Sequence, residues 1–445
     1  MEITNYEGTD LLQVENFLQH HTNLEQKTVC TLLKTCNVSF VLEGINRWQS
    51  TMICELKDSY VQQSQRYVTL DNDGYSLPEL QEDDREKAEE LVGRAFALYT
   101  EMSQLKEDFK GRPKKEHYLY GISVEDARYI LPLAVKTNLS VATTGDKLLD
   151  WFRMMNRPLD RQMFADVHDA LLQVLPEMLG EWLDTQTYEY ENDGVLNQFY
   201  QDDLDRITPK KPVVLLHTFA QPELKVGLGA LTSTKAEPPS EVLQQWGMEA
   251  AEKAKGVTKR VLGYGHTSIA EQCRTTFGMM FSLVTYHQQV RHRLPSTFRE
   301  PWLNILLEPE RPPAIPQSVI DGGFEQQYRR LVQDMQRFQQ RIAGHYRNGL
   351  WRYFLLNCQQ VKIITSTNAR MDCGILQERI CCNAQWEINA IAVAKLEELR
   401  KLSDILYQYA VPSCVYGNCK EGKMTCGKAA QMREKYCLKE ESNTK

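Results

Sequence analysis

Two long segments of the chain carry apolar residues at three- and four-residue steps. They span residues 80–109 and 324–346, and most of their other positions hold charged or amide side chains. This spacing places the apolar residues on one face of a helix. Short runs rich in β-branched residues, such as VVLLH at 213–217, are typical of strands. The pattern therefore predicts an α/β (α+β) fold in which long helices pack against small sheets.

The same elements recur in both halves of the chain. Three blocks follow one another in the same order in both halves. The first block is an apolar strand followed by a polar helix and a hydroxyl-rich loop, the second is a long amphipathic helix, and the third is a segment with an arginine near its start. The matched pairs are 37–68 with 275–303, 80–109 with 324–346, and 125–155 with 349–379, where Arg128 aligns with Arg352. We interpret the sequence as a tandem duplication. The charged, proline-containing stretch 201–212 separates the copies, so we expect two domains, 1–210 and 211–445.

The composition favours small-molecule partners. The chain has 445 residues, a net charge of −7 and 25% charged residues, and this charge balance provides no general basic surface for nucleic acid. No window approaches the roughly 18 apolar residues that a membrane span needs, and the N-terminal stretch is acidic. We therefore expect no nucleic-acid partner, no membrane insertion and a cytoplasmic location.

The 12 cysteines occupy two kinds of surroundings. Eight lie in apolar or helix-like segments, where a free cysteine usually acts as a small buried hydrophobe; they are Cys30, Cys36, Cys54, Cys273, Cys358, Cys373, Cys381 and Cys382. The other four are Cys414, Cys419, Cys426 and Cys437, and the first three have a C-x4-C-x6-C spacing that fits no standard zinc pattern. We predict no metal site, with a metal at these last cysteines as the alternative.

The stretch RHR at 291–293 holds three groups that are cationic or can become so. Adjacent cations repel one another unless an anion or a carbonyl-rich ring system lies among them, so a phosphate or a flavin is a suitable ligand. A solvated positive edge is the alternative. Two further stretches favour the ligand: GYGHTSIAEQ at 263–272 begins a helix-like run, where unpaired backbone N–H groups favour anions, and TNAR at 367–370 adds an amide and a guanidinium.

The motifs GYGHTSIAE, QQVRHR, STNAR, ERICCNAQWEI and CKEGKMTCGK resemble, in the same order and at similar spacing, those of flavin-dependent thymidylate synthases. The resemblance covers nearly the whole second copy, from about residue 213 onward. The first copy resembles the same family more weakly, through LEGINR, SYVQQSQRYV and EDARYILP. The resemblance implies two tandem domains of this type, the first degenerate and the second carrying the FAD-binding RHR motif.

The two copies depart from the family signature in complementary ways. The signature is R-H-R followed by seven residues and then S-x-R; the second copy has Pro301 and Leu303 at the last two signature positions, whereas the first copy keeps Ser64 and Arg66. The first copy has lost RHR at residues 54–57, and it has Thr144-Gly145-Asp146 in place of NAR and Met155 in place of the arginine that binds the base. Active sites in the family lie between subunits of a homotetramer. We therefore expect the two copies to supply opposite faces of one composite site, within one chain or between two.

The resemblance implies site residues by position. For the nucleotide dUMP they are Gln62, Gln63, Ser64, Gln65, Arg66, Gln288, Arg291, Arg352 and Arg379, and for FAD they are His266, Ser268, Arg291, His292, Arg293, Asn368 and Arg370. Arg379 and Arg291 are the implied catalytic residues. For Arg352 we favour a phosphate ligand over a structural salt bridge, and for Arg128 the reverse.

The predicted function is reductive methylation of dUMP to dTMP, with FAD as cofactor and NADPH and 5,10-methylenetetrahydrofolate as co-substrates. A homodimer would rebuild a pseudo-tetramer that binds one FAD per chain. Two alternatives stay open: a related flavoenzyme that acts on another pyrimidine nucleotide, and a non-catalytic module that binds a nucleotide or a flavin.

Overall fold

The computed structural model describes residues 1–21, 25–66, 70, 74–109, 111, 113–187 and 193–438. The chain forms two compact units that are discontinuous in sequence. The first unit comprises Met1–Leu196, Ser282–Arg293 and Pro301–Gln360, and the second comprises Asn197–Phe281, Leu294–Glu300 and Val361–Lys445. Part of the second copy therefore belongs to the first unit. The copy boundary near residue 210 stays a prediction.

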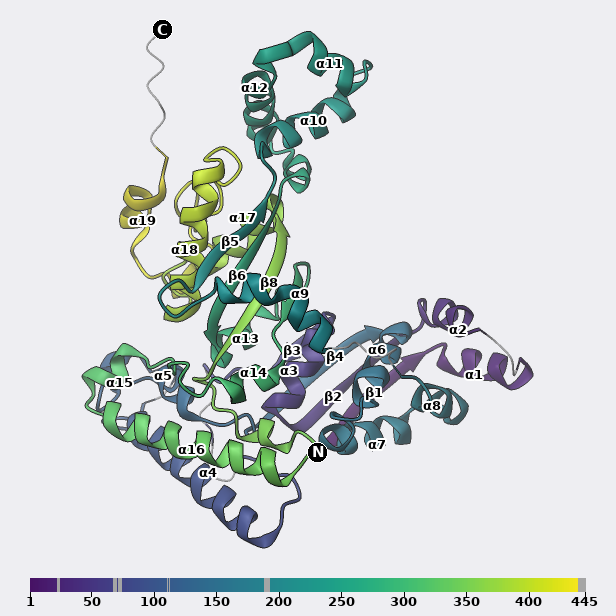
Figure 1. The fold of residues 1–445 in the computed structure, drawn as a ribbon, viewed down its shortest axis with the longest axis vertical. Helices are drawn as coiled ribbons and strands as arrows, with labels where there is room; N and C mark the ends of the chain where they lie inside the picture. The colour runs from purple at the N-terminus through teal and green to yellow at the C-terminus, as the bar shows by residue number, and fades with distance from the viewer. Residues whose placement is uncertain are drawn as a thin grey trace. The chain divides into compact units, whose positions relative to one another are not determined.

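The two copies share one topology. Each has a four-stranded antiparallel sheet, with strand order β1-β2-β4-β3 in the first copy and β5-β6-β8-β7 in the second (Figure 1). The elements of the first copy are β1 (Glu2–Thr9), α1 (Leu11–His20), α2 (Gln26–Leu33), β2 (Asn37–Asn46), α3 (Arg47–Glu55), β3 (Ser59–Gln62), α4 (Glu82–Met102), η1 (Lys115–His117), α5 (Val124–Ala127), η2 (Arg128–Ile130), β4 (Lys136–Thr144), α6 (Gly145–Met155), η3 (Gln162–Phe164), α7 (Ala165–Val174), α8 (Glu177–Asp184) and α9 (Asp193–Asp205).

The second copy repeats most of this order. Its elements are β5 (Val213–Thr218), α10 (Pro222–Thr234), α11 (Pro239–Trp246), η4 (Gly247–Glu249), α12 (Ala250–Gly263), η5 (Thr267–Gln272), β6 (Arg274–Ser282), α13 (Leu283–Gln289), β7 (Ser296–Arg299), α14 (Trp302–Leu307), α15 (Gln317–Asp321), α16 (Glu325–His345), η6 (Leu350–Phe354), β8 (Gln360–Asn368), α17 (Ala369–Arg379), α18 (Trp386–Leu402), η7 (Gly422–Met424) and α19 (Ala429–Tyr436). The mixed helix and strand content confirms the predicted fold class.

The sheet of the first unit is buried on one face. In β4, burial alternates along the strand: Leu139 is buried, whereas Asn138 and Ser140 are exposed. Successive side chains of a strand point to opposite faces, so one face is polar and the other joins the core. On the buried face Phe40 contacts Trp151 of α6, with ring centroids 5.6 Å apart.

The two long helices predicted from the apolar spacing are α4 and α16. They lie side by side in the first unit (Figure 1), and Arg94 of α4 forms a 2.7 Å ion pair with Asp334 of α16. The helix predicted over 80–109 is shorter than expected, because Leu105 pairs with Tyr118 in an isolated β-bridge and so leaves the helical path.

The first unit also holds a reciprocal contact between equivalent segments of the two copies. Pro132 and Leu356 form an antiparallel bridge. On either side of it, the backbone N–H of Leu133 donates to the carbonyl of Leu355 at 2.8 Å, and that of Asn357 donates to Leu131 at 2.9 Å. Residues 131–133 and 355–357 are matched in the repeat, so the two bonds are equivalent. This self-complementary pairing has the form of a two-fold subunit interface, built within one chain.

The sheet of the second unit is covered by α9 and the turn that follows it. Tyr200 of α9 stacks on Phe298 of β7 with ring centroids 4.1 Å apart. A buried apolar cluster underlies this contact and comprises Leu204, Ile207, Val214, Leu216, Met280 and Ile364. The predicted strand at 213–217 is β5, which pairs with β6 in the register Val213 to Met279.

Candidate active site

The cationic stretch RHR follows the C-terminal end of α13. The hydroxyl of Ser282 caps this helix by accepting from the N–H of Thr285 at 3.2 Å, which fixes its start directly after β6. The helix ends at Gln289, so Arg291 and Arg293 project from its end and are exposed. This position presents two guanidinium groups at the surface of the first unit.

This end of α13 meets the loop of the first copy that was predicted to complete the site. The Arg293 guanidinium donates to the backbone carbonyl of Tyr60 at 3.0 Å, and Arg291 lies 3.5 Å from the side-chain oxygen of Gln62. The first unit therefore brings RHR of the second copy and residues 59–66 of the first copy together within one chain.

The loop itself is held by its own bonds. Gln63 donates its N–H to Asn138 at 2.9 Å, and the hydroxyl of Ser64 accepts from the N–H of Arg66 at 3.3 Å. The Arg66 guanidinium pairs with the carboxylate of Glu125, one of whose oxygens lies 3.4 Å from Nη2. Gln65 is buried. The last two residues of the quoted motif SYVQQSQRYV, Tyr67 and Val68, lie outside the described residues.

Arg352 does not have the environment expected of a phosphate ligand. Its Nη1 forms a 2.6 Å ion pair with Asp160, its guanidinium lies over the ring of Trp48 at 5.4 Å, and the residue is 7% exposed. The geometry favours the structural salt bridge over the phosphate role that the sequence favoured. Gln288 is also buried, and its Nε2 lies 3.4 Å from the carbonyl of Val284 in its own helix.

Three buried groups near α13 were not recognised as site residues from the sequence. Arg47 opens α3, Arg128 opens η2, and His287 lies in the last turn of α13. The Nε of Arg47 donates to Nδ1 of His287 at 2.9 Å, and all three residues are at least nine-tenths buried. A signal for Arg47 was present in the repeat, because its counterpart at the start of α13 is the buried Leu283. An arginine at a position where the other copy keeps a buried leucine points to a special role.

The remaining predicted residues belong to the second unit. His266 and Ser268 are exposed, and Ser268 lies in η5, which packs against α17. Arg370 in α17 pairs with Glu271 in η5 at 2.6 Å, so the motifs GYGHTSIAEQ and TNAR are neighbours in space. Asn368 is buried and caps α17 by accepting from the N–H of Met371 at 2.9 Å.

Arg379 ends α17 and is half-buried. Its backbone carbonyl accepts from the amide of Asn389 at 3.0 Å, and its Nη2 lies 3.9 Å from the carboxylate of Glu378. The contact with Asn389 fixes the end of the helix from which the Arg379 side chain projects.

Comparison with known proteins identifies the family. A family model described as thymidylate synthase complementing protein matches residues 7–174 and 214–403, which together make up most of the chain. The chain belongs to this family. The two matched segments correspond to the two copies, as expected for a tandem arrangement.

Relatives in the thymidylate synthase complementing protein family each match about half of this chain. The flavin-dependent thymidylate synthase of Clostridium tetani is 32% identical over 205 residues, which is 42% of this chain and 82% of the relative. That of Geobacter sulfurreducens is 30% identical over 230 residues, 50% of this chain and 96% of the relative. That of Thermococcus onnurineus is 33% identical over 191 residues, 40% of this chain and 77% of the relative. The family predicted from the motifs is therefore confirmed.

The predicted FAD ligands of this family member suit that cofactor chemically. A flavin dinucleotide offers pyrophosphate oxygens and ring carbonyl oxygens, which take bonds from cations and N–H donors. Arg291 and Arg293 of the first unit and Arg370 of the second have exposed guanidinium groups, and His292 is half-buried. Asn368 fits less well, since its side-chain oxygen already serves as a helix cap.

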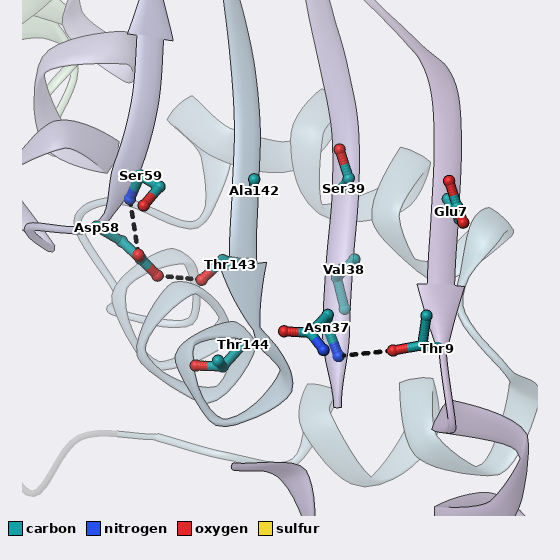
Figure 2. Close-up of a pocket in the computed structure, with 10 residues that line it drawn as sticks. All are labelled: Glu7, Thr9, Asn37, Val38, Ser39, Asp58, Ser59, Ala142, Thr143 and Thr144. Atoms are coloured by element: carbon teal, nitrogen blue, oxygen red, sulfur yellow. Dashed lines mark hydrogen bonds between the residues drawn. The ribbon is translucent and has the colours of Figure 1, made fainter. Parts of the chain in front are cut away.

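Neither the cysteines nor the hollow drawn in Figure 2 adds to this site. The 12 cysteines are present as thiols and not as disulfides, and in the described part of the chain no group of His, Cys, Asp or Glu side chains is arranged to hold a metal ion. A hollow of about 450 Å³ lies at the polar strand ends of the first sheet (Figure 2), where Asp58 accepts from the N–H of Ser59 and bonds the hydroxyl of Thr143. None of the predicted nucleotide or flavin ligands lines it.

None of the described helices is long and apolar enough to cross a membrane.

Proposed function

We propose that this chain converts dUMP to dTMP, with FAD as cofactor and with 5,10-methylenetetrahydrofolate and NADPH as co-substrates. The folate supplies a methylene carbon to C5 of the pyrimidine, and the two electrons that reduce it to a methyl group come from NADPH, leaving tetrahydrofolate and NADP⁺. Bound FAD would supply the redox chemistry that links NADPH to the pyrimidine. The relatives named flavin-dependent thymidylate synthase support this proposal.

The observation that carries the proposal is the contact between the RHR end of α13 and residues 59–66. Arg293 bonds Tyr60, and Arg291 lies beside Gln62, so the half-motifs that the two copies kept are adjacent. A decayed binding module has no physical reason to keep complementary halves in contact. This contact supports a composite site that is formed within one chain.

The chain's own residues position the substrates and balance their charge. We assign the nucleotide to the loop residues Gln62, Gln63, Ser64, Gln65 and Arg66 together with Gln288, Arg291 and Arg379. Arg352 is left out because its guanidinium forms an ion pair with Asp160. Arg379 would donate to the uracil carbonyl region and stabilise negative charge that develops on the ring. The FAD ligands in the proposal are His266, Ser268, Arg291, His292, Arg293, Asn368 and Arg370.

The assembly belongs to the same proposal. The two copies of one chain stand for two subunits of a family homotetramer, so a homodimer completes the pseudo-tetramer. Because only one copy retains RHR, the protein should bind one FAD per chain. Size-exclusion chromatography with light scattering and the flavin absorbance of the purified protein measure both quantities.

The activity is tested anaerobically by adding NADPH, methylenetetrahydrofolate and dUMP, then following flavin oxidation and dTMP formation. Arg66→Ala and Arg379→Ala should each abolish turnover, whereas Arg85→Ala should not. Arg85 is a suitable control because it lies on the exposed face of α4, where it pairs with Glu89 one turn away. Turnover near the wild-type rate in either of the first two variants would rule out the composite site.

A further inference from the structure

Three buried cationic or polar side chains in the first unit have N–H groups that are not used. They are Arg47, Arg128 and His287, which are 3%, 4% and 1% exposed. Within the part of the chain that the structure describes, Nη1 of Arg47, Nη2 of Arg128 and Nε2 of His287 find no acceptor. A buried donor without an acceptor is unfavourable, and more so when the group is charged.

The three groups come from elements that the backbone ties together. The N–H of Arg47 donates to the carbonyl of Val135 at 2.8 Å, which anchors the start of α3 to the segment that follows η2. Asn357 links the other two elements, since its amide donates to the carbonyl of Arg128 at 3.0 Å and its own carbonyl accepts from Val284 of α13 at 3.1 Å. The cluster therefore has a fixed framework.

The charges in this cluster act on one another. Burial and then the charges of Arg291 and Arg128 lower the pKa of Arg47 to about 9. Burial and then Arg47, Arg128 and Arg291 hold the pKa of His287 well below its usual range. His287 is therefore neutral, and because its Nδ1 accepts from Arg47, its proton lies on Nε2. The imidazole offers one N–H donor and holds the Arg47 guanidinium in place.

The carboxylates nearest the two buried arginines act on Arg128 without an ion pair: the charges of Glu125 and Asp126 oppose the burial that lowers the pKa of Arg128. The Nε of Arg128 donates to a backbone carbonyl, that of Glu125, at 3.0 Å, while the carboxylate of Glu125 is engaged by Arg66. Among the described residues, neither Arg47 nor Arg128 has a carboxylate at ion-pair distance. Arg352 differs in this respect, since Asp160 balances its charge. Like charges buried together are unfavourable until an anion joins them.

We propose that Arg47 is a ligand for the phosphate monoester of the nucleotide substrate, with Arg128 as the second cation and with Nε2–H of His287 as a neutral donor. The assignment rests on the proposed function, because it takes the nucleotide as the source of the anion. A monoester dianion has three terminal oxygens and up to two negative charges, which match two guanidinium groups and one N–H donor. The family resemblance assigns no ligand role to Arg47.

The site adjoins the loop assigned to the nucleotide. Arg128 lies within electrostatic reach of Arg66, and Arg47 lies within reach of Arg291. Arg66 and Arg291 are both nucleotide ligands in the proposed function. The first copy would thus supply two phosphate ligands beyond its Ser64 and Arg66, while His287 acts as a positioning residue from the second copy.

The test measures binding of dUMP, inorganic phosphate and deoxyuridine to the full-length protein by calorimetry. Arg47→Met should weaken dUMP binding about 10- to 100-fold, the loss expected for charge-assisted bonds to a dianion. Deoxyuridine lacks the phosphate, so its affinity should stay the same, and Arg85→Met should leave all three affinities unchanged. Equal dUMP affinity in Arg47→Met and wild type would overturn the proposal.

A stability measurement separates this role from a structural one. If Arg47 is an unbalanced cation that awaits an anion, Arg47→Met should leave the ligand-free protein as stable as wild type or more so, and should remove the stabilisation by inorganic phosphate at constant ionic strength. A ligand-free variant that is destabilised and still stabilised by phosphate would show that Arg47 is structural. Arg47→Lys keeps a charge but not the two-nitrogen geometry, and it should lose part of the dUMP affinity while folding normally.

Failure of the proposed reaction is recognised separately. A protein whose dUMP affinity depends on Arg47 but which takes up FAD without making dTMP would contradict the reaction and keep the phosphate site. A protein that makes dTMP with the same apparent affinity for dUMP after Arg47→Met would contradict the phosphate site and keep the reaction.

Discussion

Arg352→Met should destabilise the first unit while nucleotide binding is retained. The guanidinium of Arg352 forms a 2.6 Å ion pair with Asp160, and both residues are buried, at 7% and 5% exposed. Methionine fills much of the space of the arginine stem but leaves the Asp160 carboxylate buried without a counter-charge. This is the reverse of Arg47, whose removal relieves an excess of positive charge.

The expected magnitude follows from the pair and its surroundings. Removing one partner of a buried ion pair costs about 3–5 kcal/mol, because the other charge is left uncompensated. Loss of the contact with the Trp48 ring, 5.4 Å from the guanidinium carbon, adds about 1 kcal/mol. With a urea dependence of about 3 kcal/mol per molar, the unfolding midpoint should fall by more than about 1 M. The double variant Arg352→Met with Asp160→Leu should regain most of this loss, since it buries no charge.

The assay combines urea unfolding, followed by circular dichroism, with dUMP calorimetry under native conditions. The structural role predicts a large loss of stability in Arg352→Met and a dUMP affinity within about threefold of wild type, well under the tenfold that corresponds to 1.4 kcal/mol. Unchanged stability together with a tenfold or greater loss of dUMP affinity would refute this reasoning. That result would indicate that Arg352 binds the phosphate of the nucleotide, which is the role that the sequence favoured.

Two further predictions concern packing and pH. A Cβ at Gly227 would lie 2.8 Å from the Cβ of Ala254, so Gly227→Ala should weaken the packing of α10 on α12 and lower the stability by about 1–3 kcal/mol. A Cβ at Gly256 meets nothing within 4 Å, so Gly256→Ala should raise the stability by up to about 1 kcal/mol. Limited proteolysis and thermal unfolding distinguish the two variants. Burial raises the pKa of Asp126 above 3.8, against the opposing hydrogen bond from Ser318. The folded state therefore binds this proton more tightly than the unfolded state, and wild type should lose stability relative to Asp126→Asn as the pH rises from about 3.8 through the raised pKa. Urea midpoints measured across that range check it, and a difference that moves the other way would contradict it.

Much of the fold could be predicted from local patterns. The helices α4 and α16 follow from apolar spacing, and the shared strand order of the two sheets agrees with the repeat that was read from matched blocks. The end of α4 could not be predicted, because Leu105 leaves the helix to pair with Tyr118, and such a pairing depends on a segment outside the local window. The exchange of segments between the compact units could not be predicted either. The reciprocal pairing at Pro132 and Leu356 is one of the long-range contacts within the first unit, and no periodicity reveals it.

The candidate site, like the fold, could be predicted from the sequence only in part. The motifs indicate the charged residues and the family they resemble, and the complementary losses predict that RHR and residues 59–66 are two faces of one site. The sequence favoured the phosphate for Arg352 and a salt bridge for Arg128, and the contacts of the folded chain favour the opposite assignment. Both arginines precede a strand in matched positions. Only the folded chain gives Arg352 an ion pair with Asp160, while Arg128 has no ion pair among the described residues and feels the charge of Glu125 at a distance.

The sequence by itself determined the duplication, the two long helices, the complementary losses and the family, because all of these are patterns along the chain. Only the tertiary structure decided which buried cations are balanced. Arg352 meets Asp160 across 192 positions of sequence, and Arg47 meets His287 across 240. The free energy of a buried charge depends on desolvation and on its nearest counter-charge, and both are properties of three-dimensional packing that no local pattern contains.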